Sequence, residues 1–183
     1  FKGKTKASTW VNKNVLQLLT SEGELVKYNI KTGLSSSSRL AIPKQPIDIQ
    51  SIFYGPDDKI WTGGYLVGGN ASYNIKTGKS SEHLGLMQTE GMAKKGKDIY
   101  FGIYPNAQLY KYQTENDWDV KNKNPKLIGQ IPGQSRPFAI LSHDSLTHIY
   151  FATVPNYGML GGAITSYNPT NGKLETFEVI KNQ

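Results

Sequence analysis

The 183-residue sequence contains no cysteine, so it can form neither a disulfide framework nor a thiolate metal site. No apolar run approaches the roughly 18 residues of a membrane-spanning helix, which predicts that no segment spans a membrane. Only two of the 21 cationic residues are arginine, and the lysines are scattered through predicted turns. Nucleic-acid sites cluster their cations and favour arginine. We therefore expect no nucleic-acid partner, despite a formal charge of +7.

The common catalytic motifs are missing too. The sequence has no Gly-x-Ser-x-Gly elbow, no phosphate-binding loop and no His-Glu-x-x-His helix. The adjacent acids Asp57 and Asp58 resemble a pair of cation ligands, but acids in a Gly-Pro-Asp-Asp segment ordinarily form a turn. We therefore predict no cofactor and no metal, and we assign no catalytic residue.

A repeated phrase is the clearest positive feature. Tyr-Asn-Ile-Lys-Thr-Gly occupies residues 28–33 and 73–78, and a variant, Tyr-Asn-Pro-Thr-Asn-Gly, occupies 167–172. Alignment on this phrase places glutamines at equivalent positions 45, 88, 134 and 183, separated by 43, 46 and 49 residues on subtraction. This spacing matches the roughly 40 to 50 residues of a β-propeller blade.

Each repeat has the pattern of four short strands separated by turns rich in glycine, proline and asparagine. We predict an all-β fold, a β-propeller of four-stranded antiparallel blades in a single domain covering residues 1–183. The expected blades are 5–44, 45–87, 88–133 and 134–183. Their fourth strands are predicted at 39–42, 83–86, 126–131 and 175–180, and the third blade carries an insertion at 114–124.

The segment Gly-Pro-Asp-Asp-Lys-Ile-Trp-Thr-Gly-Gly at 55–64, followed by the phrase at 73–78, resembles bacterial propeller repeats. These are the repeats of streptogramin-lyase-like and two-component-regulator proteins, a type related to WD40 and YVTN repeats. The resemblance implies six to eight blades. We therefore expect a partial ring, with further blades missing from this chain or supplied by self-association. A complete four-bladed disc is the alternative.

The resemblance also implies where a lyase would hold its metal, with a histidine and a carboxylate near the axis. The three histidines do not match that pattern. His143 and His148 flank a tight turn on the opposite face, and His83 begins an outer strand. The catalytic motif of the family is therefore not matched.

In a four-stranded meander, the loops between the second and third strands share one face with the connections between blades. The long, glycine-rich segments 63–70, 104–107 and 155–162 belong to this face, and such loops often carry function. The alternative is that they only wrap a crowded rim. Tyr65, Tyr104 and Tyr157, with Asn106, would suit sugar stacking or peptide contact. Four further tyrosines, at 28, 73, 112 and 167, are expected to pack between blades.

Two residues after the aligned glutamines, the repeats place Ile47, Glu90 and Arg136 at equivalent positions. We predict that Glu90 and Arg136 converge near the central channel. They would either present a carboxylate and a guanidinium to a ligand or form an ion pair between blades. Gln88 and Gln134 join the candidate ligand-binding set, although they would equally serve to tie backbone groups between blades.

Three hypotheses follow for function. The first is a non-enzymatic or accessory binding module of a bacterial extracellular or cell-surface protein, with a carbohydrate-like or polypeptide ligand over the loop face. The second is a propeller lyase or hydrolase acting on a lactone, uronate or cyclic ester, with Glu90 and Arg136 at its centre. The third is a sensory propeller domain of a signalling protein.

Overall fold

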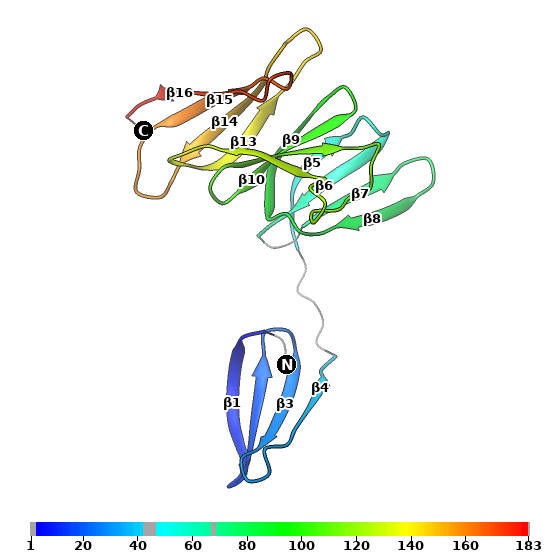
Figure 1. Cartoon of the computed structure of the whole chain (residues 1–183), viewed down its shortest axis with the longest axis vertical. Coiled ribbons are helices and arrows are strands. Elements are labelled where there is room, and N and C mark those ends of the chain that lie inside the picture. Colours follow the sequence, from blue (N-terminus) through cyan, green and yellow to red (C-terminus); the bar gives the residue numbers. More distant parts are fainter. Residues whose placement is uncertain (1–2, 42–46, 67–68, 183) are drawn as a thin grey trace. The chain divides into compact units, whose positions relative to one another are not determined.

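The computed structural model describes residues 3–41, 47–66 and 69–182, and within them it contains sixteen β-strands and no helix. The strands form four separate antiparallel sheets of four, each a simple meander in sequence order (Figure 1). The chain divides into two compact units, Phe1–Pro46 and Ile47–Gln183. The predicted all-β architecture of four-stranded blades is therefore confirmed. Gln45 and Gln183, two of the aligned glutamines, lie outside the described residues.

The first unit holds one sheet. Its strands are β1 (Thr5–Asn12), β2 (Val15–Thr20), β3 (Glu24–Asn29) and β4 (Ser35–Arg39). Most of its side chains are exposed or half-buried, and Val26 is its buried apolar residue.

The second unit holds the other three sheets, which pack face to face as blades. The first of them consists of β5 (Ile49–Tyr54), β6 (Lys59–Gly64), β7 (Asn70–Asn74) and β8 (Lys79–His83). The next consists of β9 (Gln88–Lys95), β10 (Asp98–Tyr104), β11 (Gln108–Gln113) and β12 (Lys126–Gln130). The last consists of β13 (Gln134–Leu141), β14 (Ile149–Pro155), β15 (Gly162–Tyr167) and β16 (Leu174–Ile180). The first strand β9 contacts the first strands of both neighbouring blades, β5 and β13, and these three are the innermost strands of their blades.

The repeated phrase forms the hairpin between the third and fourth strands of a blade. The Asn74 side-chain oxygen accepts hydrogen bonds from the amides of Lys76 and Thr77, both at 3.0 Å. Gly78 closes the turn at a φ of 70°, a left-handed conformation that glycine adopts without a steric cost. Asn29 makes the same contacts in its own turn. Asparagine and glycine recur in the phrase because this turn requires both.

The fourth strands of the first two blades begin earlier than predicted, at Ser35 and Lys79 instead of residues 39 and 83. Pairing resumes directly after the turn, with Tyr28 opposite Ser35 and Asn74 opposite Lys79. These outermost strands are almost entirely exposed, and their residues are mostly serine and lysine, with no alternation of apolar and polar side chains. The sequence therefore lacks the alternation that would have indicated where these strands begin.

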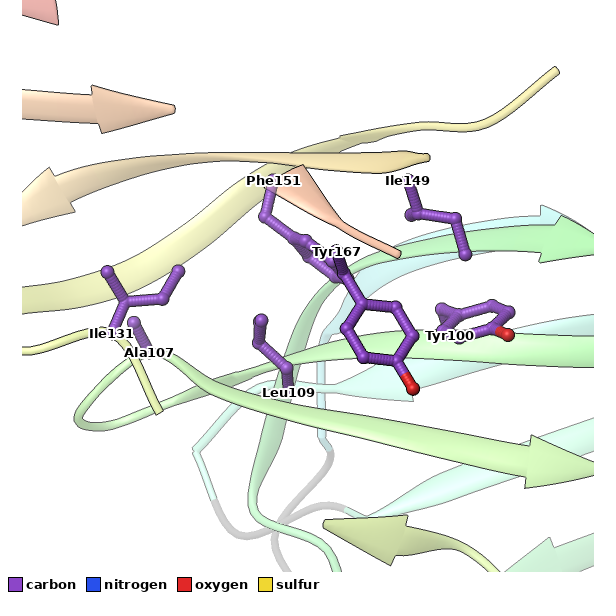
Figure 2. Close-up of a cluster of buried hydrophobic side chains, with 7 residues drawn as sticks. All are labelled: Tyr100, Ala107, Leu109, Ile131, Ile149, Phe151 and Tyr167. Atoms are coloured by element: carbon purple, nitrogen blue, oxygen red, sulfur yellow. The ribbon is translucent and has the colours of Figure 1, made fainter. Parts of the chain in front are cut away.

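Two hydrophobic clusters hold the three blades of the second unit together. Strand β10 contributes to both, because its side chains alternate between the two faces of the sheet. One face meets the β5–β8 blade in a cluster of Trp61, Leu86, Ile99, Phe101, Ile103 and Tyr112. The other face meets the β13–β16 blade in a cluster of Tyr100, Ala107, Leu109, Ile131, Ile149, Phe151 and Tyr167 (Figure 2).

The insertion in the third blade folds back over the seam with the second. Trp118 donates its indole N–H to the Leu84 carbonyl at 2.9 Å and lies 6.0 Å from Trp61 between ring centroids. Asn124 anchors the loop, donating its amide to the carbonyls of Gln113, Asn116 and Asp117. The insertion thus acts as a strap across two blades.

Of the four tyrosines predicted to pack between blades, Tyr112 and Tyr167 do so, whereas Tyr28 and Tyr73 are exposed. Tyr73 pairs with Ile60 and therefore points away from Trp61, which faces the third blade. This outward face of the β5–β8 blade also exposes Ile52 and Tyr54. Within the second unit it has no blade against it.

Candidate functional site

The candidate site lies where the innermost strands begin. Strand pairing sets Gln88 opposite Tyr104 and Gln134 opposite Pro155, so each innermost strand starts beside the loop that follows the second strand. The β5–β6 pair has the same arrangement, with Ile49 opposite Gly64. The predicted grouping of loops and blade connections on one face is therefore correct, and we call it the loop face.

A β-bulge interrupts the start of every innermost strand in the second unit. The residue left without a partner is Gln50 in β5, Glu90 in β9 and Ser135 in β13. A bulge twists its strand locally and redirects a side chain. Here it turns Gln50 and Glu90 toward each other across the blade boundary.

Glycines allow these strands to approach closely. A side chain at Gly91 would place its Cβ 2.9 Å from the Phe138 carbonyl oxygen, and one at Gly63 would reach 2.6 Å from the Thr89 Cβ. Ser51 uses this proximity to donate its hydroxyl to the Thr89 carbonyl at 2.8 Å. The position of Glu90 is therefore fixed by backbone packing on both sides.

Glu90 is the centre of a network that joins three blades. Its Oε1 accepts from Arg136 Nη1 at 2.6 Å and from Gln88 Nε2 at 2.9 Å, and its Oε2 accepts from Gln50 Nε2 at 2.9 Å. The carboxylate is completely inaccessible to solvent. A buried charge needs such partners, because an unpaired one would cost several kcal/mol. The predicted convergence of Glu90 and Arg136 is found, in the form of an ion pair between blades.

Arg136 is the charged member of this network that solvent reaches. Its side chain is 18% exposed, and its guanidinium lies over the Tyr104 ring at 4.0 Å from the centroid. Burial works against the charged form, but the Tyr157 hydroxyl and the Glu90 carboxylate outweigh it and raise the pKa of Arg136. The guanidinium is thus a fixed cation that is paired with Glu90 and stacked on the Tyr104 ring.

The two aligned glutamines are buried and have different partners. Gln88 accepts from the Leu66 amide at 2.9 Å and donates to Glu90, so it ties the second blade to the third. Gln134 donates to the Gly161 carbonyl at 3.0 Å and accepts from the Thr153 hydroxyl at 2.8 Å, both within its own blade. Both side chains are occupied by the protein itself.

The structure assigns the contact with Glu90 in the second blade to Gln50 instead of Ile47. Ile47 is exposed and precedes β5. The repeat alignment placed Ile47 at the position equivalent to Glu90, but the bulge residue of β5 is Gln50, three residues further along the chain. Gln50 has no distinguishing signal in the sequence. The number of residues before a bulge cannot be inferred from the spacing of turn motifs alone.

The other predicted site residues lie on the loops that follow the second strands of the blades. Tyr65 and Tyr157 are exposed, and Asn106 is exposed in a left-handed conformation with a φ of 67°. Sequence analysis did not single out Leu66, Met159 and Leu160, which are exposed on the same two loops as Tyr65 and Tyr157. Met159 lies 3.8 Å from the position of a Cβ on Gly133, so the 156–161 loop covers the turn that leads into β13.

The remaining polar candidates have structural partners away from this cluster. His83 stacks on Trp61 at 4.6 Å and its Nε2 lies 2.8 Å from the Ser72 hydroxyl. Burial, and to a lesser degree Lys59, lowers the pKa of His83. Asp57 pairs with Lys59 at 2.9 Å, and Asp58 pairs with Lys76 at 2.7 Å. Among the described residues, no group of three or more acidic or histidine side chains could hold a metal ion.

Comparison with known proteins identifies the fold. No family model matches the sequence, and no curated protein matches it. The structure is similar to the extracellular domain of a putative one-component system, BT4673, from B. thetaiotaomicron, with a TM-score of 0.52 and 17% identity. It is similar to the β-propeller domain of Cps50 (Swd1) from Myceliophteria thermophila, with a TM-score of 0.54 and 11% identity, and to the tricorn protease, with 0.52 and 15%.

These matches cover 96 to 100% of this chain. They cover only 23% of the one-component-system domain, 17% of the tricorn protease and 58% of the Cps50 domain. The chain is therefore a β-propeller module that spans part of the length of the propellers it resembles. In the parts of the chain that the structure describes, no helix has the length and apolarity to cross a membrane.

Proposed function

We propose that the chain is a ligand-binding propeller module whose ligand sits over the loop face at Arg136. The observation that carries this proposal is the environment of the guanidinium. It is anchored by a buried carboxylate, stacked on Tyr104 and still partly open to solvent. An arginine has five N–H donors, and one whose side-chain conformation is already fixed by its contacts can orient a polar or anionic ligand without losing side-chain entropy on binding.

The surroundings of Arg136 support a binding role over a purely structural one. An ion pair that only joined blades would not need tyrosines on two different loops around its exposed edge. Tyrosine and arginine are the residues that contribute most often to binding energy at interfaces. The ligand is a carbohydrate-like or polypeptide molecule, and the module belongs to a bacterial surface or secreted protein.

The experiment is a screen followed by a substitution test. Glycans and peptides are arrayed, and each molecule that binds is then titrated calorimetrically against the native chain and the variants Arg136→Lys and Tyr104→Leu. We expect both variants to bind about tenfold more weakly, which corresponds to about 1.4 kcal/mol. Arg39→Lys, at an exposed arginine on β4, should bind like the native chain. Unchanged binding by both site variants would contradict the proposal.

A sensory role is the second candidate function. The observation that favours it is the similarity to the extracellular domain of a putative one-component system. In that case the same face would receive the signal molecule, and the full-length protein would respond to it. The enzyme hypothesis is not supported by the geometry around Glu90. The carboxylate of Glu90 is inaccessible to solvent and paired with Arg136, so it is not positioned to act as a general base on a ligand over this face.

A further inference from the structure

The polar groups of the loop face are mostly used by the protein itself. The carboxylate of Glu90 and the side-chain amides of Gln88 and Gln134 are buried and bonded internally. In the described part of this network, Arg136 is the charged side chain that solvent reaches. A ligand therefore meets one fixed cation, and the further polar groups on these loops are the Asn106 amide and the tyrosine hydroxyls.

Exposed apolar side chains lie on two loops of the same face as this cation. Tyr157, Met159 and Leu160 are 82%, 53% and 67% exposed on the loop between β14 and β15. Leu66 is exposed on the loop after β6, and its amide is held by Gln88, which in turn bonds to Glu90. Large exposed apolar side chains on the same face as an accessible charge are typical of an interaction surface.

We infer that the occupant of this face is a polypeptide segment in which one carboxylate is flanked by apolar side chains. The inference rests on the proposed function and narrows its ligand class. A carboxylate matches the guanidinium fork, and the flanking side chains match Tyr157, Met159 and Leu160. A saccharide would need an array of hydrogen-bonding groups to match its hydroxyls, and the buried amides here are already occupied. The formal charge of +7 also favours an acidic partner.

The test uses short, end-blocked peptides that contain one glutamate flanked by leucine and phenylalanine. Matched peptides carry glutamine in place of glutamate, and an oligouronate series serves as the carbohydrate arm. We expect the glutamate peptides to bind the full chain and the glutamine peptides to bind about tenfold more weakly. The oligouronates should not bind.

Two variants probe the two halves of the surface. Arg136→Lys keeps a cation beside Glu90 but loses the planar fork, so the preference for glutamate over glutamine should fall several-fold. The pair Met159→Ser and Leu160→Ser changes exposed side chains only, so it leaves folding intact and should weaken the glutamate peptides about tenfold. Leu127→Ser, at an exposed leucine on the outer strand β12, is the matched control and should change nothing.

The possible failures are distinguishable. Oligouronate binding that Arg136→Lys weakens, without peptide binding, overturns the polypeptide inference and supports the proposed function. Peptide binding that neither Arg136→Lys nor the double serine variant affects overturns both. The absence of binding by peptides and oligouronates alike also overturns both.

Discussion

The Nη1 atom of Arg136 on β13 lies 2.6 Å from Oε1 of Glu90 on β9, and this pair links the innermost strands of two neighbouring blades. The two partners differ in environment, because the carboxylate is fully buried whereas the guanidinium remains partly exposed. The pair is therefore asymmetric. Loss of the cation leaves a buried charge with only neutral donors, whereas loss of the anion leaves a cation that water can still reach.

We accordingly expect Arg136→Gln to destabilise the second unit by about 3 kcal/mol, in the range for removal of one partner from a buried pair. Glu90→Gln should cost only about 1 kcal/mol, because its amide oxygen still accepts from a neighbour and the guanidinium left without its partner is partly exposed. Urea unfolding followed by tryptophan fluorescence measures both. Trp10→Phe in the background confines the signal to Trp61 and Trp118, which belong to the second unit. Equal losses for the two variants would contradict the asymmetry.

The convergence of Glu90 and Arg136 was predictable because equivalent positions of neighbouring blades lie side by side around a common axis. The hydrogen-bond partners around that pair could not be predicted in this way. Gln50 enters the network through a bulge, and Gln134 bonds within its own blade whereas its counterpart Gln88 bonds across a seam. Repeat spacing locates a residue in a blade, but hydrogen-bond partners depend on local bulges and on loops that differ from blade to blade.

The aromatic seam between the second and third blades predicts a pH-dependent stability. Burial lowers the pKa of His83, so the folded chain binds its proton more weakly than the unfolded chain does. Stability is therefore full above the unfolded-state value of about 6.5 and falls as the pH drops below it. His83→Asn should reduce this slope below about pH 6.5 in chemical unfolding, whereas His143→Asn, at an exposed turn, should leave it intact. A native slope unchanged by His83→Asn would count against this assignment.

The strap formed by the third-blade insertion depends on Trp118. Its ring packs against Trp61, His83, Phe101 and Tyr112, and its N–H bonds to Leu84. Trp118→Ala should cost about 2 kcal/mol, less than a fully buried tryptophan, because the residue is half-buried. It should also release the loop, so that trypsin cleaves at Lys121 and Lys123 at least several-fold faster. Leu127→Ala is the control, and cleavage at the native rate in Trp118→Ala would exclude a strap.

Blade type could be predicted from the sequence because the Tyr-Asn-x-x-x-Gly turn, present in three of the four blades, imposes its own residues. Asn74 and Gly78 are required by the hairpin geometry, so their spacing reports the repeat directly. The strap could not be predicted in the same way. An insertion rich in asparagine and lysine resembles a solvated loop, and the contacts of Trp118 with side chains of another blade depend on tertiary packing alone.

The outward faces of the outer blades in the second unit lead to a final prediction, on association. The β5–β8 blade exposes Ile52 and Tyr73, and the β13–β16 blade exposes Ile164 and Phe177 on the side away from Phe151. In closed propellers such faces are buried against further blades, and exposed apolar areas of this kind promote association. We expect sedimentation of the native chain to show a mass that rises with concentration, and Ile52→Lys or Phe177→Lys to reduce it. A native chain that stays monomeric at every concentration tested would argue against supply of further blades by self-association.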